Sequence, residues 1–268
     1  MIPLTDPDVQ RRISPYVTLA LIALNAAVFL YELLFLSGFQ TTLFFYNWGL
    51  IPANFSQGLS DYGRVCDGLV ISTPLGAVCQ GTIVDLEAHN EVWVTVFSSM
   101  FIHSGFMHFA GNMVYLWVFG ANIENGLGHI KYLVFYLACG VAAALTQVYI
   151  DPESRIPMVG ASGAVAGTLG AYIIMYPYNR ISAIVMLGLL FVIRVPALFL
   201  LGFWFFIQNV LPGLGSLATT ASGTGGVAFW AHIGGFIAGA LAMTFYLAVT
   251  RRRALPDVRR IPWRWSRW

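Results

Sequence analysis

The chain has 268 residues, of which 58% are hydrophobic and only 10% are charged. This composition excludes a soluble globular protein, which carries more charge and fewer large apolar side chains. The formal net charge of +2 indicates no particular partner by itself. The three cysteines form no C-x-x-C pair and the chain has no H-E-x-x-H motif, so no metal site is predicted.

Apolar runs close to the ~20 residues that cross a bilayer recur along the chain and predict an all-α polytopic membrane protein. The first run, residues 16–38, has no small-residue cleavage site behind it, so we interpret it as a retained span and not a signal peptide. Six transmembrane helices are expected in all, over residues 16–38, 97–122, 129–148, 162–176, 197–211 and 227–249.

Residues 181–193 are apolar but number only 13, and Arg194 and Pro196 follow them. At ~1.5 Å of rise per residue, a helix of this length falls well short of the ~30 Å hydrocarbon core. We interpret this stretch as an interfacial or re-entrant piece between the fourth and fifth spans.

The basic residues indicate the orientation. Six spans place both termini on one side, and every basic residue except Arg64 and Arg155 falls on that side. The positive-inside rule makes this side the cytoplasm, so we expect a multi-pass protein of a prokaryotic cell membrane. The cytoplasmic parts are then residues 1–15, 177–196 and the basic tail 250–268, and the extracytoplasmic loops are 39–96, 149–161 and 212–226. A polybasic tail beside a membrane predicts contact with anionic lipids.

The outer segment 39–96 is long for a connection, which predicts structure or a function of its own. It contains Cys66 and Cys79, and disulfides persist on the outer side of a membrane. A disulfide between these two cysteines and two unpaired thiols stay open as alternatives.

Ser162 lies among very small residues, in the stretch Val159–Gly167, where a polar loop becomes an apolar helix. A serine at such a place is most often a helix cap. The fourth span is short, however, at ~22 Å of helix. If it ends at the inner face, Ser162 lies below the outer surface and stays reachable from outside.

His232 in the sixth span is expected ~7–8 Å below the same surface, and so at a similar depth. An ionisable side chain at membrane depth is a functional hypothesis by default. The pairs Gly163/Gly167 and Gly235/Gly239 are small-x-x-x-small faces, which let membrane helices pack closely. They provide a way for the fourth and sixth spans to bring Ser162 and His232 together.

A serine hydroxyl becomes a good nucleophile when an adjacent imidazole takes its proton, and acyl transfer then needs donors for the oxyanion. His108 and Asn112 are four residues apart, so they share one helix face, and both can donate hydrogen bonds. The last three spans contain no acidic residue to orient His232. These residues therefore predict a Ser–His dyad, with His103 as a structural neighbour.

Ser162 in Gly-Ala-Ser-Gly, His108-x-x-x-Asn112 and Ala231-His232-x-x-Gly235-x-x-x-Gly239 together resemble the rhomboid family of intramembrane serine proteases. The likeness covers about residues 93–250 and implies a six-helix rhomboid-like bundle with a long outer loop after the first helix. It implies that Ser162 is the nucleophile and His232 the general base, with His108 and Asn112 supporting the oxyanion. It also implies transmembrane protein substrates, no cofactor, no nucleic-acid partner, and a gating role for loop 212–226. The Trp-Arg pair usual in the family's first loop is absent from residues 39–92.

Two other functions are compatible with parts of the sequence. A catalytically inactive relative would act as a chaperone or binding protein for membrane proteins. A transporter would also use glycine-packed helices with buried His and Asn, but the chain shows no internal repeat and no carboxylate in the last three spans.

Overall fold

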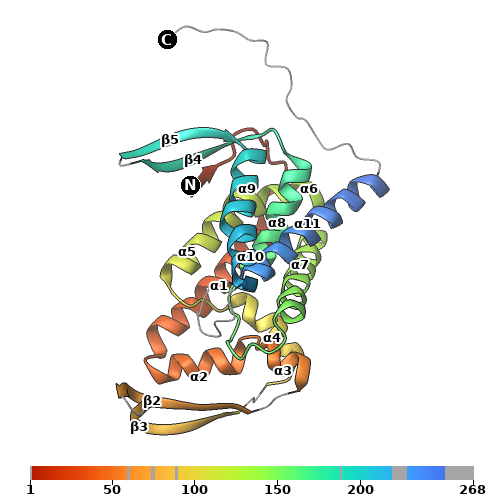
Figure 1. The fold of residues 1–268 in the computed structure, drawn as a ribbon. Helices are drawn as coiled ribbons and strands as arrows, with labels where there is room; N and C mark the ends of the chain where they lie inside the picture. The colour runs from red at the N-terminus through yellow and green to blue at the C-terminus, as the bar shows by residue number, and fades with distance from the viewer. Residues whose placement is uncertain are drawn as a thin grey trace, which may run out of the picture.

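A computed structural model of the chain describes residues 2–58, 61–73, 76–87, 90–187, 189–218 and 228–250. Apolar helices make up most of the described fold, with small β-sheets at opposite ends of the helical bundle (Figure 1). Four described helical stretches are long and apolar enough to cross a membrane: Tyr16–Phe35, His129–Ile150, Ala197–Ser216 and Phe229–Thr250. The expected class, a polytopic helical membrane protein, is therefore confirmed, whereas the count of six spans stays a prediction.

Helix α8 (Ser162–Met175) forms the centre of the bundle. Every residue from Gly163 to Tyr172 is buried, so the helix is enclosed on all sides and is apolar all round. Helices α7 (His129–Ile150) and α11 (Phe229–Thr250) pack against it. The residue that begins α8 is Ser162, which the packing of α8 therefore holds at a fixed place in the bundle.

The region of the predicted second span, 97–122, consists of two helical parts separated by a short break. Helix α4 (Val92–Ser98) and a 3-10 turn, η1 (Ser99–Phe101), end before a turn. The long helix begins again at Phe106 and comprises α5 (Phe106–Tyr115), the π turn η2 (Leu116–Gly120) and α6 (Ala121–Leu127). Ser104 and Gly105 are weak helix formers and interrupt the run.

The helix that contains the predicted fifth span, 197–211, continues past residue 211. Helix α9 (Ala197–Phe205), the π turn η3 (Phe206–Val210) and α10 (Leu211–Ala218) follow one another without a break. Membrane helices tolerate a proline such as Pro212 because local π adjustments satisfy the freed backbone groups. The expected gating loop 212–226 thus begins as helix, and its residues 219–226 lie outside the described residues. The basic tail from residue 251 also lies outside them.

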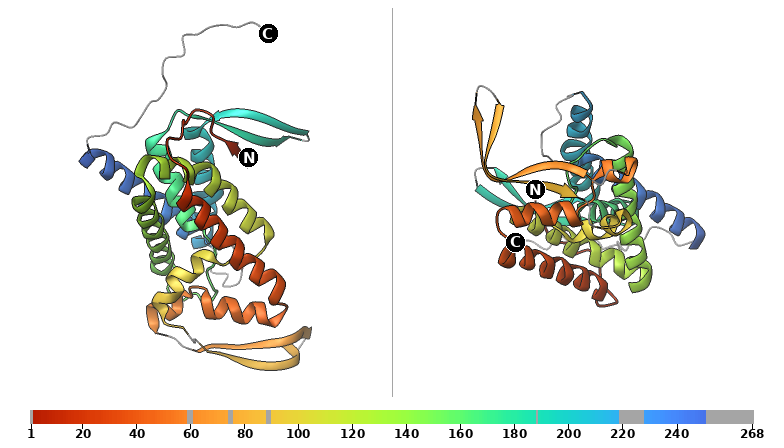
Figure 2. Two further views of the ribbon diagram at one scale, coloured as in Figure 1. Left: turned by 180° about the vertical axis from the view of Figure 1, so that it is seen from behind. Right: turned by 90° about the horizontal axis from the view of Figure 1, so that it is seen from below.

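The apolar stretch 181–193, expected to be an interfacial or re-entrant piece, lies in two antiparallel strands. Strand β4 (Arg180–Leu187) pairs with β5 (Leu189–Pro196), and the N-terminal strand β1 (Ile2–Thr5) pairs with β4 to complete a sheet of order β1-β4-β5. The run is rich in β-branched residues, which favour strands, and short apolar runs do not distinguish helix from strand by periodicity. Figure 2 (left) shows this sheet at one end of the bundle.

Helix α1 (Tyr16–Phe35) precedes the outer segment. The segment contains helices α2 (Phe39–Trp48) and α3 (Pro52–Gln57), followed by strands β2 (Asp61–Thr73) and β3 (Gly76–Glu87). The β2–β3 hairpin lies at the end of the bundle opposite to β1-β4-β5 (Figures 1 and 2). The long connection therefore has a structure of its own, as its length predicted.

The register of β2 and β3 pairs Cys66 with Ile83 and Cys79 with Val70. Four positions of the ladder thus separate the two cysteines, or about 13 Å at ~3.3 Å per residue. Bridged Cα atoms lie within about 7 Å of each other. The backbone register thus pairs each cysteine with another residue. The cysteine side chains lie outside the described ones, so the disulfide stays a prediction.

Glu124 in α6 fastens the start of α1 to the rest of the bundle. Its carboxylate accepts hydrogen bonds from the amides of Val17 and Thr18, at 2.9 and 2.8 Å, and from the Thr18 hydroxyl at 2.6 Å. His129 lies 2.6 Å from the same carboxylate. Burial alone would raise the pKa of Glu124, but these hydrogen bonds outweigh burial and lower it. A carboxylate here caps the free amides and opposes the positive end of the α1 dipole.

Asp6 fastens the N-terminal segment to the central helix. Its carboxylate accepts hydrogen bonds from the Tyr172 hydroxyl in α8 and from Asn122 at 2.9 Å. Burial raises the pKa of Asp6, and the hydrogen bond from Tyr172 partly offsets that effect. Asp6 and Glu124 together hold β1 and α1 at the end of α8 that is remote from Ser162.

Candidate active site

Ser162 and His232 are in direct contact. The hydroxyl oxygen Oγ of Ser162 lies 2.7 Å from Nε2 of His232, although 70 positions separate the two residues in the sequence. Ser162 begins α8, and His232 lies in the first turn of α11 with its side chain buried. The expected approach of these two side chains is therefore present in the structure.

The predicted glycine faces bring α8 and α11 together. A Cβ atom built on Gly235 would overlap the carbonyl of Gly163, and one built on Gly239 would overlap the carbonyl of Gly167. Only glycine allows the two backbones to approach this closely. Because Gly235 lies one turn beyond His232, this contact places the imidazole beside the start of α8.

His108 lies on the other side of Ser162. Gly160 has a φ of +130°, and a Cβ atom there would lie 2.7 Å from Nε2 of His108 and 3.4 Å from Oγ of Ser162. The Ser104 hydroxyl lies 3.2 Å from Nδ1 of His108, so Nε2 is the ring nitrogen that faces Gly160. The ring of His108 and the Ser162 hydroxyl therefore border the same small space above Gly160.

Asn112, the second residue expected to support the oxyanion, hydrogen-bonds within its own helix. It is buried, and its Nδ2 donates a 3.0 Å hydrogen bond to the carbonyl of His108, one turn earlier in α5. An amide nitrogen carries two hydrogens, so one of them is not used by this bond.

His103 packs against His108, with ring centroids 5.2 Å apart in an edge-to-face arrangement. It is 1% exposed, and among the described residues neither ring nitrogen has a hydrogen-bond partner. Its backbone amide donates to the Glu32 carboxylate at 3.3 Å. His103 therefore supports the ring of His108 and anchors the turn before α5 to α1.

Asn209 is the residue at this site that the sequence analysis missed. Its Oδ1 lies 2.7 Å from Nδ1 of His232, and its Nδ2 donates a 2.9 Å hydrogen bond to the carbonyl of Trp204. The Trp204 ring lies beside the imidazole, with centroids 6.0 Å apart. A polar side chain within an apolar membrane helix was the available signal, but nothing in the sequence connects Asn209 with His232.

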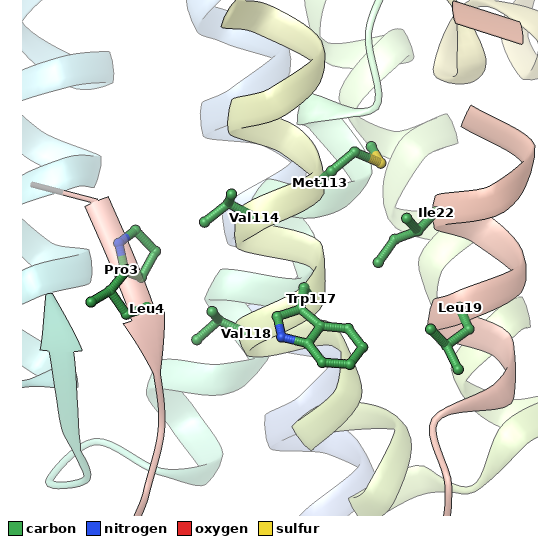
Figure 3. A pocket seen from close by; sticks show the side chains of 8 residues that line it. All are labelled: Pro3, Leu4, Leu19, Ile22, Met113, Val114, Trp117 and Val118. Carbon is green, nitrogen blue, oxygen red and sulfur yellow. The ribbon is translucent and has the colours of Figure 1, made fainter. Parts of the chain in front are cut away.

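A separate groove is lined by side chains of β1, α1 and the helix that contains α5 and η2 (Figure 3). Its volume is about 370 Å³, and its walls are apolar side chains: Pro3, Leu4, Leu19, Ile22, Met113, Val114, Trp117 and Val118. None of these residues belongs to the Ser162–His232 site. The groove has no polar group suited to chemistry, so the contact between Ser162 and His232 is the stronger candidate active site.

A partly buried serine hydroxyl beside a buried imidazole, within a bundle of apolar helices, defines an integral membrane protein with a candidate hydrolase site. Residues 89–249 match the model of the rhomboid domain, which is more than half of the chain. The chain therefore belongs to the rhomboid family.

Three relatives illustrate the similarity. The chain is 31% identical over 156 residues to rhomboid protein 1, mitochondrial, of Saccharomyces cerevisiae, covering 55% of this chain and 40% of the relative. It is 30% identical over 118 residues to the rhomboid protease GluP of Bacillus subtilis, covering 44% and 22%. It is 30% identical over 152 residues to the human presenilin-associated rhomboid-like protein, mitochondrial, covering 55% and 36%. The matched regions thus span less than half the length of these relatives.

Proposed function

We propose that this protein is an intramembrane serine endopeptidase that hydrolyses peptide bonds in or near transmembrane segments of other membrane proteins. The observation that carries the proposal is the 2.7 Å contact between Oγ of Ser162 and Nε2 of His232 inside the bundle. A nucleophile within hydrogen-bond reach of its base is the arrangement that activates a serine hydroxyl. Membership of the rhomboid family supports the same conclusion.

In the proposed reaction, His232 takes the proton of the Ser162 hydroxyl while Oγ attacks the carbonyl carbon of the scissile bond. The protonated imidazole then donates that proton to the leaving amine as the peptide bond breaks. A water molecule gives up a proton to His232 and attacks the acyl carbon, which releases the new carboxyl end and returns Ser162 to its starting state. No step requires a metal or an organic cofactor.

His108 supports the oxyanion in this proposal. The Ser104 hydroxyl and Nδ1 of His108 lie 3.2 Å apart. We assign the hydroxyl as the donor in this contact, so that Nε2, which faces the space above Gly160, carries the proton of His108. That space borders Oγ of Ser162, where the tetrahedral oxyanion forms. The free amides at the start of α8 and the second Nδ2 hydrogen of Asn112 are further donors.

We also propose the orientation that the basic residues favour, with both termini in the cytoplasm and the active site opening to the extracytoplasmic side. The start of α8 then lies nearer the outer surface, and the β2–β3 hairpin lies outside. Substrates are transmembrane proteins that reach Ser162 from within the bilayer. Relatives of the chain include mitochondrial and bacterial proteins. The kind of cellular membrane that holds this protein therefore depends on the organism in which it occurs.

The test is cleavage of a model single-span protein by the purified full chain in liposomes. Ser162→Ala and His232→Ala should each reduce cleavage to background, because each removes one half of the reacting pair. Ser56→Ala is the matched control, since its hydroxyl is exposed and contacts only the Pro152 carbonyl at 2.6 Å. Full cleavage by Ser162→Ala would refute the proposal. Stable binding of the single-span protein without cleavage by the unmodified chain would favour the inactive chaperone instead.

A further inference from the structure

Asn209 is the third side chain in line with Ser162 and His232. We propose that Asn209 is a positioning residue that fixes the tautomer and orientation of the His232 ring. This inference rests on the proposed function, because it concerns how His232 is prepared to act as a base. Asn209 touches the imidazole and not the reacting atoms of a substrate.

The carbonyl of Trp204 determines which way the Asn209 amide faces. A carbonyl can only accept a hydrogen bond, so the atom 2.9 Å from it must be the amide nitrogen Nδ2. The other end of the amide, Oδ1, is then the atom 2.7 Å from Nδ1 of His232. The Trp204 backbone therefore prevents the exchange of the two amide ends.

The tautomer of His232 follows from this orientation. Oδ1 is an acceptor only, so Nδ1 of His232 must carry the proton. In a neutral imidazole the other nitrogen, Nε2, then has a free lone pair. Nε2 is the atom 2.7 Å from Oγ of Ser162, so the serine hydroxyl donates to it. This is the protonation state in which His232 can accept the serine proton.

The π turn η3 (Phe206–Val210) brings the side chain of Asn209 close to the carbonyl of Trp204. An α-helix places residue i+4 against residue i, whereas a π turn brings residue i+5 there. Asn209 is the fifth residue after Trp204 and hydrogen-bonds to its carbonyl. Single π turns inside α-helices often occur at functional sites.

Burial makes the contact between Asn209 and His232 important for the orientation of the His232 ring. Asn209 is 2% exposed and His232 is 8% exposed, so water does not replace a lost partner freely. The Trp204 ring lies beside the imidazole, and Trp204 also packs near Phe236, which limits other ring positions. A neutral amide holds the tautomer without adding a net charge at membrane depth, where a carboxylate is expensive.

The first test compares Asn209→Leu with Gln208→Leu. Leucine is close to asparagine in size but cannot accept from Nδ1, and Gln208 is the exposed neighbouring amide on the same helix. Cleavage of the single-span protein should lose kcat by roughly 10- to 100-fold in Asn209→Leu, with KM unchanged, because a buried N–H is left without a partner. Gln208→Leu should retain the kcat of the unmodified protein.

The second test measures the tautomer of His232 directly, by ¹⁵N NMR of proteins in detergent whose histidines are labelled with ¹⁵N. It compares Asn209→Leu with Ser56→Ala, the control variant that retains Asn209. The His232 signal is identified by its absence in His232→Ala. Proteins that retain Asn209 should show His232 protonated at Nδ1, and Asn209→Leu should show a mixture of tautomers. A residue that only stabilised the fold would not change this ratio.

The outcomes separate this inference from the proposed function. Absence of cleavage by the unmodified protein refutes the peptidase, while the NMR spectrum still tests the tautomer. Equal kcat in Asn209→Leu and Gln208→Leu overturns the positioning role and leaves the Ser–His pair intact. A His232 ring protonated at Nε2 in the protein with native Asn209 also overturns it, even if Asn209→Leu does not fold.

Discussion

Substitution of Gly235 by alanine tests whether the close approach of α8 and α11 sets the geometry of the site. The added methyl group overlaps the carbonyl oxygen of Gly163, which is backbone and cannot rotate away. Carbon and oxygen atoms in contact lie about 3.3–3.6 Å apart, so α11 has to move away from α8 by on the order of 1 Å. His232 lies one turn from Gly235 and moves with it.

The movement lengthens the contact between Oγ of Ser162 and Nε2 of His232. This contact is 2.7 Å, and an increase of about 1 Å takes it beyond the range of a useful hydrogen bond. A misplacement of about 1 Å reduces rates by about 100-fold. We therefore expect kcat for cleavage of the single-span protein in liposomes to fall by about two orders of magnitude in Gly235→Ala.

Gly202→Ala in α9 is the matched control, because a Cβ atom at Gly202 meets no atom within 4 Å. This variant should retain its kcat and gain a little helix stability. Both proteins are compared after their melting temperatures show that they are folded. Equal kcat in folded Gly235→Ala and Gly202→Ala would refute the view that glycine packing sets the Ser162–His232 distance.

Two further predictions concern other parts of the chain. Gly160→Ala should lower kcat by more than 10-fold and also lower the melting temperature, because its φ of +130° is unfavourable for alanine and its Cβ would lie 2.6 Å from the His108 ring. An unchanged kcat in the folded variant would contradict the arrangement of His108. Glu124→Gln should lower the free energy of unfolding by about 2 kcal/mol at pH 7, since the amides of Val17 and Thr18 lose a charged acceptor. The folded pKa of Glu124 lies below the ordinary 4.5, so this contribution is complete above pH 4.5 and disappears as the pH falls through the folded pKa. Thermal unfolding of both proteins in detergent from pH 7 to 3 measures the difference, and a difference that did not shrink on acidification would contradict the assignment.

The position of the active site within the bundle explains why its polar groups are paired so completely. Unsatisfied polar groups are costly at membrane depth, and irregular backbone is tolerated there only where protein or a water-filled cavity surrounds it. His232 accordingly uses both ring nitrogens, one with Ser162 and one with Asn209. His103 differs from His232, because neither of its ring nitrogens has a partner among the described residues, and these nitrogens mark a place where water would be stabilised.

The amino-acid sequence by itself determined the membrane class, the family resemblance, and the pairing of Ser162 with His232. Span length and apolarity are local properties, and the glycine pairs 163/167 and 235/239 lie on helix faces that can be read from a spacing of four. The positions of these features along two helices were enough to predict which side chains would meet.

The tertiary structure alone decided that Asn209 contacts His232, and it also decided the shape of the connections. The contact between Asn209 and His232 depends on the π turn η3 and on the packing of its helix against α11. Neither feature can be recognised from a periodic pattern in the sequence. The stretch 181–193 became a hairpin because pairing with β1, nearly 180 residues earlier, satisfies its backbone hydrogen bonds. The register of β2 and β3, which pairs Cys66 with Ile83 and Cys79 with Val70, is likewise a property of the strand pairing. Each of these features depends on partners distant in the chain, and local residue preferences do not specify distant partners.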